Sequence, residues 1–299
     1  MSFKSLKEIV DCANKEKKPF WRVILEEDMS ERMVSEEESF GTMQGMYDTM
    51  RMADASYDEK LKSASGLVGG DGKKMKEAVE AGKTMAGDFI GDVMVKALKM
   101  GESNACMKRI VAAPTAGSCG VMPAVFLTYQ EKYKVSDEKM IEAMFVAAGI
   151  GEIIAERAFI AGATGGCQAE IGSASAMAAG GLAYLQGGAE EEIVHAAAMS
   201  LKNLLGLVCD PVAGLVEVPC VKRNVIGAVN AITSADMAMA GIVSRIPPDE
   251  VIDAMRAVGM ALPGTLKETG EGGLAATPAG EEIARRMSKQ KKKVYEAES

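Results

Sequence analysis

Three cysteines in the second half of the chain stand next to glycine or proline, residues that interrupt regular structure. Cys167 follows two glycines, Cys209 begins a Cys-Asp-Pro run, and Cys220 follows a proline. The stretch from Cys209 to Cys220, CDPVAGLVEVPC, is apolar apart from Asp210 and Glu217. Thiolates turned inward at such breaks can bind a metal ion or cluster, whereas buried thiols also serve as small apolar packing residues. The spacing leaves both interpretations open.

Other uses of cysteine are less well supported. The N-terminus, MSFKSLKEIV, lacks the apolar core of a secretory signal, so we expect a cytoplasmic protein, where lasting disulfides are uncommon. No Cys-x-x-Cys motif occurs, which argues against a thioredoxin-like redox pair and a zinc ribbon. Cys12, Cys106 and Cys119 have no recognisable motif and are predicted to be packing residues.

His195 is the single histidine of the chain. One histidine excludes histidine-rich zinc sites, a His-Glu-x-x-His pair and a two-histidine iron site formed by this chain alone. His195 follows Ile193 by two residues, which is about 200° around a helix and therefore opposite the apolar stripe. We predict a solvated side chain, so a Ser-His-Asp or Cys-His mechanism is not favoured.

The segment PTAGSCG, residues 114–120, is predicted to be a loop that leads into a helix. Free N–H groups at a helix start, together with the hydroxyls of Thr115 and Ser118, can hold a carboxylate or a phosphate. It is not a Walker loop, because no Gly-Lys-Ser/Thr follows, and a plain turn is the alternative. The glycine-rich run SGLVGGDG, from residue 65, is not a dinucleotide fingerprint, since no strand precedes it.

The rest of the sequence predicts the helices that must position these groups. Ser136 precedes apolar residues at 141, 144, 145 and 148, a helical spacing after a good N-terminal signal. A second stripe, at 193, 196, 197, 201, 204 and 205, leads to Cys209. A third helix is expected to open at residues 247–250 and stop by 263–264, and a last one to start at 277–278.

Strand-like alternation is hard to find, so we predict an all-α protein: a compact multi-helix domain with glycine-rich loops around the functional site. We expect one domain over residues 1–299, with a helical N-terminal region (1–60) and a core (61–299). Aromatic residues make up only 5% of the chain, against 32 glycines and 22 methionines, a composition that suits closely packed helices. The small residues of 114–123 and 162–181 permit either tight helix packing or close approach to a ligand.

Charge and hydropathy limit the partners. The net charge of −8 gives nucleic-acid binding no general support, and the basic run 289–293 is predicted to be a frayed helix end. The uncharged run 110–130 contains two prolines and two glycines, which makes a poor bilayer helix. We therefore expect neither a nucleic-acid nor a membrane partner.

Several long motifs resemble one family. They are SGLVGGDGKKM (65–75), SNACMKRIVAAPTAGSCGVMPAV (103–125), GATGGCQAEIGSASAMAAGG (162–181), NLLGLVCDPVAGLVEVPCVKRN (203–224) and LKETGEGGLA (266–275). The strings GCQAEIG and GLVCDPVAGLVEVPC are the most specific, and the first 60 residues match less distinctively. In these motifs the chain resembles the α subunit of the iron–sulfur-dependent L-serine dehydratases, or L-serine ammonia-lyases.

The resemblance implies a [4Fe–4S] cluster held by Cys167, Cys209 and Cys220. It also implies conversion of L-serine to pyruvate and ammonia without pyridoxal phosphate, a reaction of amino-acid degradation that feeds gluconeogenesis. Single-chain members carry a further β region with a Ser-Ser-His-Thr motif that this chain lacks. The implied enzyme is therefore a hetero-oligomer with a separate β subunit. Some relatives have a histidine shortly before the second cysteine, where this chain has Lys202-Asn203, so no role passes to that position.

The matched motifs supply the candidate site residues. The carboxylate of the substrate is expected to bind near the 115–118 loop, with the substrate-binding candidates Ser65, Asn104, Thr115, Ala116, Gly117 and Ser118. The general base is unknown, and its candidates are Glu170, Lys267 and Glu268. Further polar residues of the motifs are Gln168, Asp210 and Thr269, for which helix capping and structural hydrogen bonding are equally good interpretations.

Other functions fit the same residues. One alternative keeps the cluster and changes the substrate, giving an L-cysteine desulfidase or a dehydratase of threonine or another 3-hydroxy acid. A second is a non-catalytic iron–sulfur redox sensor subunit. A third is a helical interaction subunit whose cysteines are merely buried.

Overall fold

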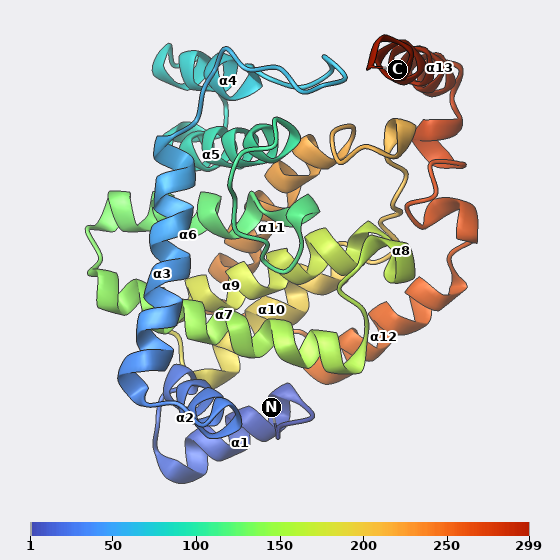
Figure 1. Cartoon of the computed structure of the whole chain (residues 1–299). Coiled ribbons are helices and arrows are strands. Elements are labelled where there is room, and N and C mark those ends of the chain that lie inside the picture. The colour runs from blue at the N-terminus through green and yellow to red at the C-terminus, as the bar shows by residue number, and fades with distance from the viewer. Residues whose placement is uncertain (1, 299) are drawn as a thin grey trace.

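The computed structural model describes the backbone of residues 2–298 and the side chains of residues 2–289 (Figure 1). The first half of the chain forms α1 (Leu6–Glu16), α2 (Phe20–Arg32), α3 (Glu36–Ala55), α4 (Asp71–Glu80), α5 (Gly87–Ala105), α6 (Val121–Tyr133) and α7 (Asp137–Arg157). The second half forms α8 (Gly162–Gly165), α9 (Ser173–Leu185), α10 (Glu190–Lys202), α11 (Cys220–Met239), α12 (Pro248–Ala261) and α13 (Pro278–Glu298). A π-turn, η2 (Gln168–Gly172), runs directly into α9, and short 3-10 turns include η1 (Ala116–Ser118) and η3 (Val212–Gly214).

The helix starts follow the predicted capping signals. The Ser136 hydroxyl accepts a hydrogen bond from the Lys139 N–H at 3.2 Å and starts α7, with two acids in its first turn. Pro248 occupies the first position of α12, and α13 begins at Pro278, as expected. The predicted helix from 193 to 205 extended too far: α10 ends at Lys202, and residues 204 and 205 lie in the turn that follows.

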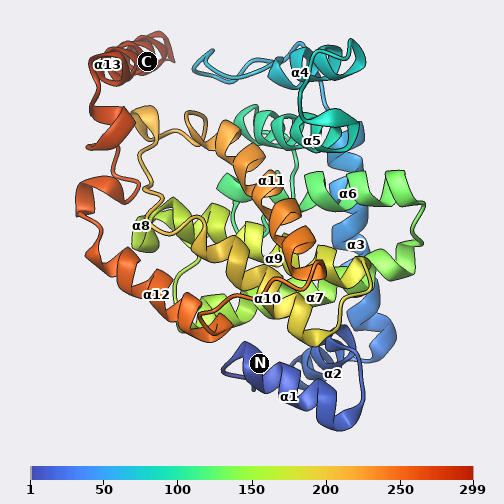
Figure 2. The same cartoon turned by 180° about the vertical axis from the view of Figure 1, so that it is seen from behind.

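Helix α9 lies at the centre of the molecule, with α7, α10, α11 and α6 packed around it (Figures 1 and 2). Every residue from Ser173 to Tyr184 is buried, which a helix built from Ala, Gly, Ser and Met permits on all its faces. A Cβ atom at Gly181 would lie 2.5 Å from Cζ of Phe126 and 3.1 Å from the carbonyl oxygen of Ala143. The absence of that atom lets α6 and α7 approach α9 closely.

The N-terminal helices α1 and α2 lie at one end of the molecule, and α4 and α13 lie at the other (Figures 1 and 2). A continuous hydrophobic core runs from α1 through α12. A second, small cluster of Val68, Leu98 and Val221 anchors the glycine-rich loop before α4 between α5 and the start of α11. This anchor brings an N-terminal loop next to the segment that carries Cys220.

The prediction of an all-α architecture is confirmed. Between residues 2 and 298 no strand forms, and the single extended contact is an isolated parallel bridge between Cys209 and Lys267. Over the same described range, no helix is long and apolar enough to cross a bilayer.

The packing of α9 yields a stability prediction. Gly181→Ala should lower the free energy of unfolding by about 1–3 kcal/mol, because the added methyl meets a buried ring and a backbone carbonyl. Gly45→Ala, in α3, is the control, since a Cβ there meets nothing within 4 Å. That variant should match the parent or gain up to about 1 kcal/mol. Urea unfolding followed by far-ultraviolet circular dichroism measures both, and equal stabilities would contradict the packing argument.

Candidate functional site

The three motif cysteines come from three different segments, and all three are buried. Cys167 precedes the π-turn η2, Cys209 lies in the extended segment after α10, and Cys220 is the first residue of α11. Their exposed fractions are 3%, 3% and 9%. All six cysteines of the chain are free thiols, so the disulfide interpretation has no support in this structure.

The charges of these thiols act on one another's ionisation. Burial raises the pKa of Cys167 to about 11 and that of Cys220 to about 12, and it raises the pKa of Cys209 further. The charge of Cys167 adds to the rise in the pKa of both other thiols, while the Arg223 guanidinium opposes the rise at Cys167 and Cys220. Three buried thiols that disfavour one another's ionisation become thiolates together only when a cation or cluster compensates their charge.

The donor set limits what could be held there. Within the described residues, no group of three or more His, Cys, Asp or Glu side chains is arranged to hold a metal ion. An iron–sulfur cluster takes each thiolate on a different iron, so its ligands need not converge on one point, and three thiols without histidine suit it.

The π-turn η2 sets the direction of Cys167 and Glu170. Gln168, whose side chain is fully buried, fixes this turn through both ends of its amide. Its Nε2 donates to the carbonyl oxygens of Gly165 (2.9 Å) and Met255 (3.0 Å), and its Oε1 accepts from the Gly206 N–H at 2.9 Å. π-turns inserted before α-helices are common at functional sites, because they turn side chains away from the regular helical positions.

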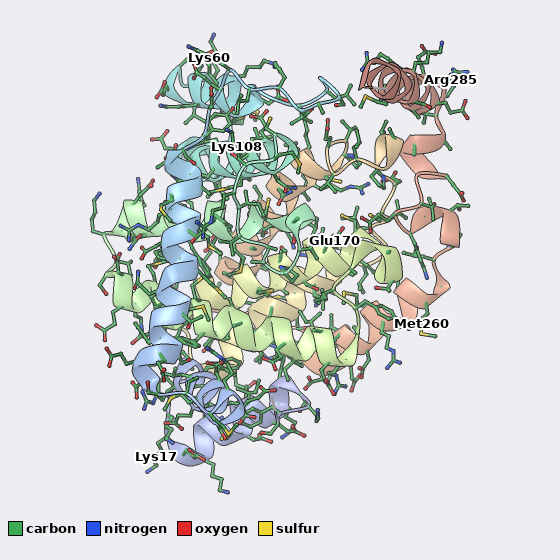
Figure 3. The ribbon with its side chains drawn as sticks, viewed as in Figure 1. Lys17, Lys60, Lys108, Glu170, Met260 and Arg285 are labelled. Atoms are coloured by element: carbon green, nitrogen blue, oxygen red, sulfur yellow. The ribbon has the colours of Figure 1, made fainter. Side chains whose placement is uncertain are left out.

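Glu170 connects Cys209 to residues 115–118, the predicted ligand loop. It lies near the middle of the molecule in Figure 3. Its Oε1 accepts a hydrogen bond from the Thr115 hydroxyl at 2.9 Å, and its Oε2 lies 3.9 Å from Sγ of Cys209. Burial raises the pKa of this carboxyl, the Thr115 hydrogen bond opposes the rise, and the charge of Glu268 adds to it. A carboxylate that holds a proton more tightly than usual suits a general base.

A close approach at Gly162 shows how tightly this region is assembled. A Cβ atom on Gly162 would lie 2.8 Å from both Sγ of Cys209 and Oε2 of Glu170. Only a residue without a side chain leaves room there, so α8 closes directly over the pair.

The loop at residues 115–118 has the features of an anion-binding turn. It forms η1, closed by hydrogen bonds between the hydroxyls and backbones of Thr115 and Ser118, and α6 starts three residues later. The N–H groups of Ala116 and Gly117 have no hydrogen-bond partner within the described part of the chain. Asn104 donates from Nδ2 to the Ala116 carbonyl at 3.2 Å, which turns the N–H of the same peptide, that of Gly117, the opposite way.

The other two base candidates lie in the segment that pairs with the backbone of Cys209. The Cys209 N–H donates to the Leu266 carbonyl at 2.9 Å, and the Glu268 N–H donates to the Cys209 carbonyl at 2.7 Å. Lys267 is half-buried, whereas Glu268 is exposed and has a positive φ of 64°. The backbone of this segment thus supports Cys209, and the Glu268 charge acts on the pKa of both Cys209 and Glu170.

Ser65 contacts the segment that precedes Cys220. Its hydroxyl and that of Ser63 both donate to the carboxylate of Glu217, the Ser63 bond measuring 2.8 Å, and all three side chains are buried. Through these hydrogen bonds Ser65 helps to link the loop before α4 to the segment that precedes Cys220. Its predicted role in substrate binding is untested.

Some residues of the site were not singled out from the sequence. Arg223 donates to the Val208 carbonyl (2.7 Å) and to the Asp210 carboxylate (2.8 Å), and so joins α11 to the segment of Cys209. Asn224 donates from Nδ2 to the Gly117 carbonyl of the ligand loop at 2.8 Å. Arg223 and Asn224 are the last two residues of the motif at 203–224, but a single sequence does not show what their side chains contact. The predicted solvation of His195 was too simple, because its ring is half-buried and its Nδ1 is buried with no partner in the described region.

Comparison with known proteins identifies the family. The family model described as "Serine dehydratase alpha chain" matches residues 15–275. The chain belongs to this family. The matched range includes the three cysteines and the 115–118 loop described above.

Two relatives match over nearly their whole length. The "Probable L-serine dehydratase, alpha chain" of Bacillus subtilis (strain 168) is 46% identical over 285 residues, which cover 95% of each chain. The "L-serine dehydratase, alpha chain" of Peptoniphilus asaccharolyticus is 42% identical over 288 residues, 95% of this chain and 98% of that relative. A longer relative, "L-serine dehydratase 1" of Escherichia coli (strain K12), is 44% identical over 181 residues, which are 60% of this chain and 40% of that protein.

The π-turn yields a prediction that does not depend on activity. Gln168→Ala should lower the free energy of unfolding by about 3 kcal/mol, because it leaves buried carbonyls unpaired and opens a cavity. Gln186→Ala is the control: it removes one 3.3 Å bond from a partly exposed glutamine at the end of α9 and should cost less than about 1 kcal/mol. Thermal unfolding of both variants measures the difference, and a similar loss in the two would contradict the role of Gln168.

Proposed function

We propose that this chain is the catalytic alpha subunit of an iron–sulfur L-serine dehydratase. It would convert L-serine to pyruvate and ammonia, with a [4Fe–4S] cluster in place of pyridoxal phosphate. Membership of the serine dehydratase alpha chain family and the names of the relatives support the reaction. The single observation that carries the proposal is Glu170, which contacts a motif cysteine with one oxygen and the ligand loop with the other.

The three thiols are the residues that would hold the cluster. Cys167, Cys209 and Cys220 provide three ligands for four irons, so one iron would remain open as a Lewis acid that makes the serine hydroxyl a better leaving group. Arg223 stands beside the thiols and offsets part of the negative charge that they carry when ionised. The cluster, its ligands and the absence of pyridoxal phosphate all belong to the proposal.

The ligand loop would bind the other end of the substrate. The free N–H groups of Ala116 and Gly117 point donors at a carboxylate, as helix starts do for anions, and the Thr115 and Ser118 hydroxyls add polar contacts. The same donors would stabilise the negative charge that develops on the carboxylate side as the Cα proton leaves.

Glu170 is the general base that the geometry favours among the three candidates. It lies between the loop that would hold the carboxylate and the thiols that would hold the cluster, so it can reach the Cα proton of a serine that spans the two. Loss of that proton and of the hydroxide gives aminoacrylate and water. Tautomerisation to the imine, followed by hydrolysis with one water, releases pyruvate and ammonia, so the atoms balance.

A partner chain completes the proposal. The chain covers only 40% of the longer Escherichia coli relative, so most of that relative has no counterpart in the matched region. The alpha-chain names of the other two relatives point the same way. We infer that a separate beta subunit supplies the remaining part and that the working enzyme is a cytoplasmic hetero-oligomer.

The cysteine assignment gives the first test. After anaerobic reconstitution with iron and sulfide, Cys167→Ser, Cys209→Ser and Cys220→Ser should each lose most of the broad visible absorbance. Each should also lose pyruvate formation from L-serine when the beta subunit is present, since a hydroxyl is a poor iron ligand. Absorbance and a coupled pyruvate assay measure the two losses.

Cys119→Ser is the matched control for these variants. Cys119 is buried like the site cysteines, but its thiol contacts the Met100 carbonyl at 3.7 Å. Its variant should keep both the absorbance and the activity. Full activity in the three site variants, and its persistence in air, would contradict the cluster mechanism. Absorbance without turnover of L-serine, L-threonine or L-cysteine would favour a sensor.

The base assignment gives the second test. Glu170→Gln should lower kcat by about 10²–10⁴-fold, because an amide does not accept the Cα proton, while the visible absorbance stays unchanged. Glu268→Gln is the control, since that carboxylate is exposed and acts on Glu170 only through its charge. Its kcat should change by less than about tenfold. A larger loss in Glu268→Gln than in Glu170→Gln would reverse the assignment.

A further inference from the structure

One buried amide joins the two halves of the proposed site. The Nδ2 of Asn224 donates to the Gly117 carbonyl at 2.8 Å and to the Cys220 carbonyl at 3.0 Å, and its Oδ1 accepts from the Gly120 N–H at 2.8 Å. Its side chain is 1% exposed. Only this orientation of the amide satisfies all three partners, because two of them are acceptors and one is a donor.

The position of Asn224 in α11 explains the contact with Cys220. The helix begins at Cys220, and Asn224 lies four residues later, on the same face and one turn along. The side chain of Asn224 thus bonds the first turn of the helix that begins at Cys220, a proposed cluster ligand, and it also bonds the ligand loop. A shift of α11 relative to the loop would break at least one of its three hydrogen bonds.

The ligand loop has no space in which to move independently of this amide. A Cβ on Gly120 would lie 2.7 Å from the Ala97 carbonyl oxygen and 3.0 Å from Oδ1 of Asn224, so the loop is wedged between α5 and α11. On its other side the Thr115 hydroxyl contacts Glu170. The loop therefore lies between the general base and the helix of Cys220, with Asn224 as its link to the latter.

We propose that Asn224 is a positioning residue that fixes the ligand loop in register with Cys220, so that carboxylate binding and cluster binding share one rigid frame. This role rests on the proposed function for its catalytic meaning. The structural part does not depend on it: Asn224 holds the Gly117 carbonyl and the Gly120 N–H, and so sets the orientation of two peptides that directly follow the loop's free N–H groups.

The test compares two asparagines of the same helix. Asn224→Asp keeps the size of the side chain but replaces its two donor bonds by repulsion between a carboxylate and two carbonyls. Asn230→Asp is the matched control. Asn230 also donates to a carbonyl, that of Ser200 (2.8 Å), and accepts from Asn203 (2.9 Å), but its partners lie in α9, α10 and the turn after α10. Asn224→Ala provides a second variant in case the aspartate does not fold.

The first readout is hydrogen exchange in the chain alone, without cluster or substrate. In the Asn224 variants the hydrogen-bonded amides within residues 115–121 should exchange about tenfold faster or more, because the Gly120 N–H loses its buried acceptor or the loop loses its anchor. Asn230→Asp should leave this segment as in the parent and speed exchange in α9 and α10 instead.

The second readout is kinetic, in the assembled enzyme. The Asn224 variants should raise KM for L-serine by about tenfold or more, with a smaller change in kcat, since the loop binds the carboxylate in ground and transition states alike. Equal KM and equal exchange at 115–121 in the Asn224 and Asn230 variants would overturn the proposal. If the parent enzyme does not turn over L-serine, the proposed function fails, and the exchange comparison still decides the role of Asn224.

Discussion

The site depends on how closely helices can approach one another when side chains are nearly absent. Helix α9 is buried on every face, and its glycines bring α6 and α7 within contact of its backbone. Because α9 continues directly from the π-turn, the same packing fixes Cys167 and Glu170. Interiors packed to this density resist small displacements, so a polar group set at the end of such a helix keeps its position.

Buried side-chain amides link backbone groups of segments that lie far apart in the sequence. Gln168 ties the π-turn to α12 and to the turn at Gly206, and Asn104 and Asn224 hold neighbouring carbonyls of the ligand loop. An amide offers both donors and an acceptor without a charge, so it satisfies mixed backbone groups in the interior with no counter-ion. The proposed chemistry then uses the three thiols and Glu170, with Arg223 beside the thiols.

The sequence predicted the helices and nominated the candidate site residues, but it did not predict the contacts that link these residues. Periodicity and capping residues placed α7, α12 and α13, because such signals are local in the chain. The contact between Thr115 and Glu170 spans 55 residues, and that between Ser65 and Glu217 spans 152, and no local pattern encodes either. The sequence therefore did not predict the contact of Ser65 with Glu217, nor the contacts of Asn224, although Asn224 is the last residue of the motif at 203–224.

The short pairing of Cys209 with residues 266–268 has a consequence for the order in which the protein matures. This segment supports Cys209 from a position near the end of the chain, and its backbone bonds form only when residues beyond 260 are available. A nascent chain emerges N-terminal end first, so the other walls of the site are synthesised well before this last one. The backbone of Cys209 therefore reaches its final pairing only after almost the whole chain has been made.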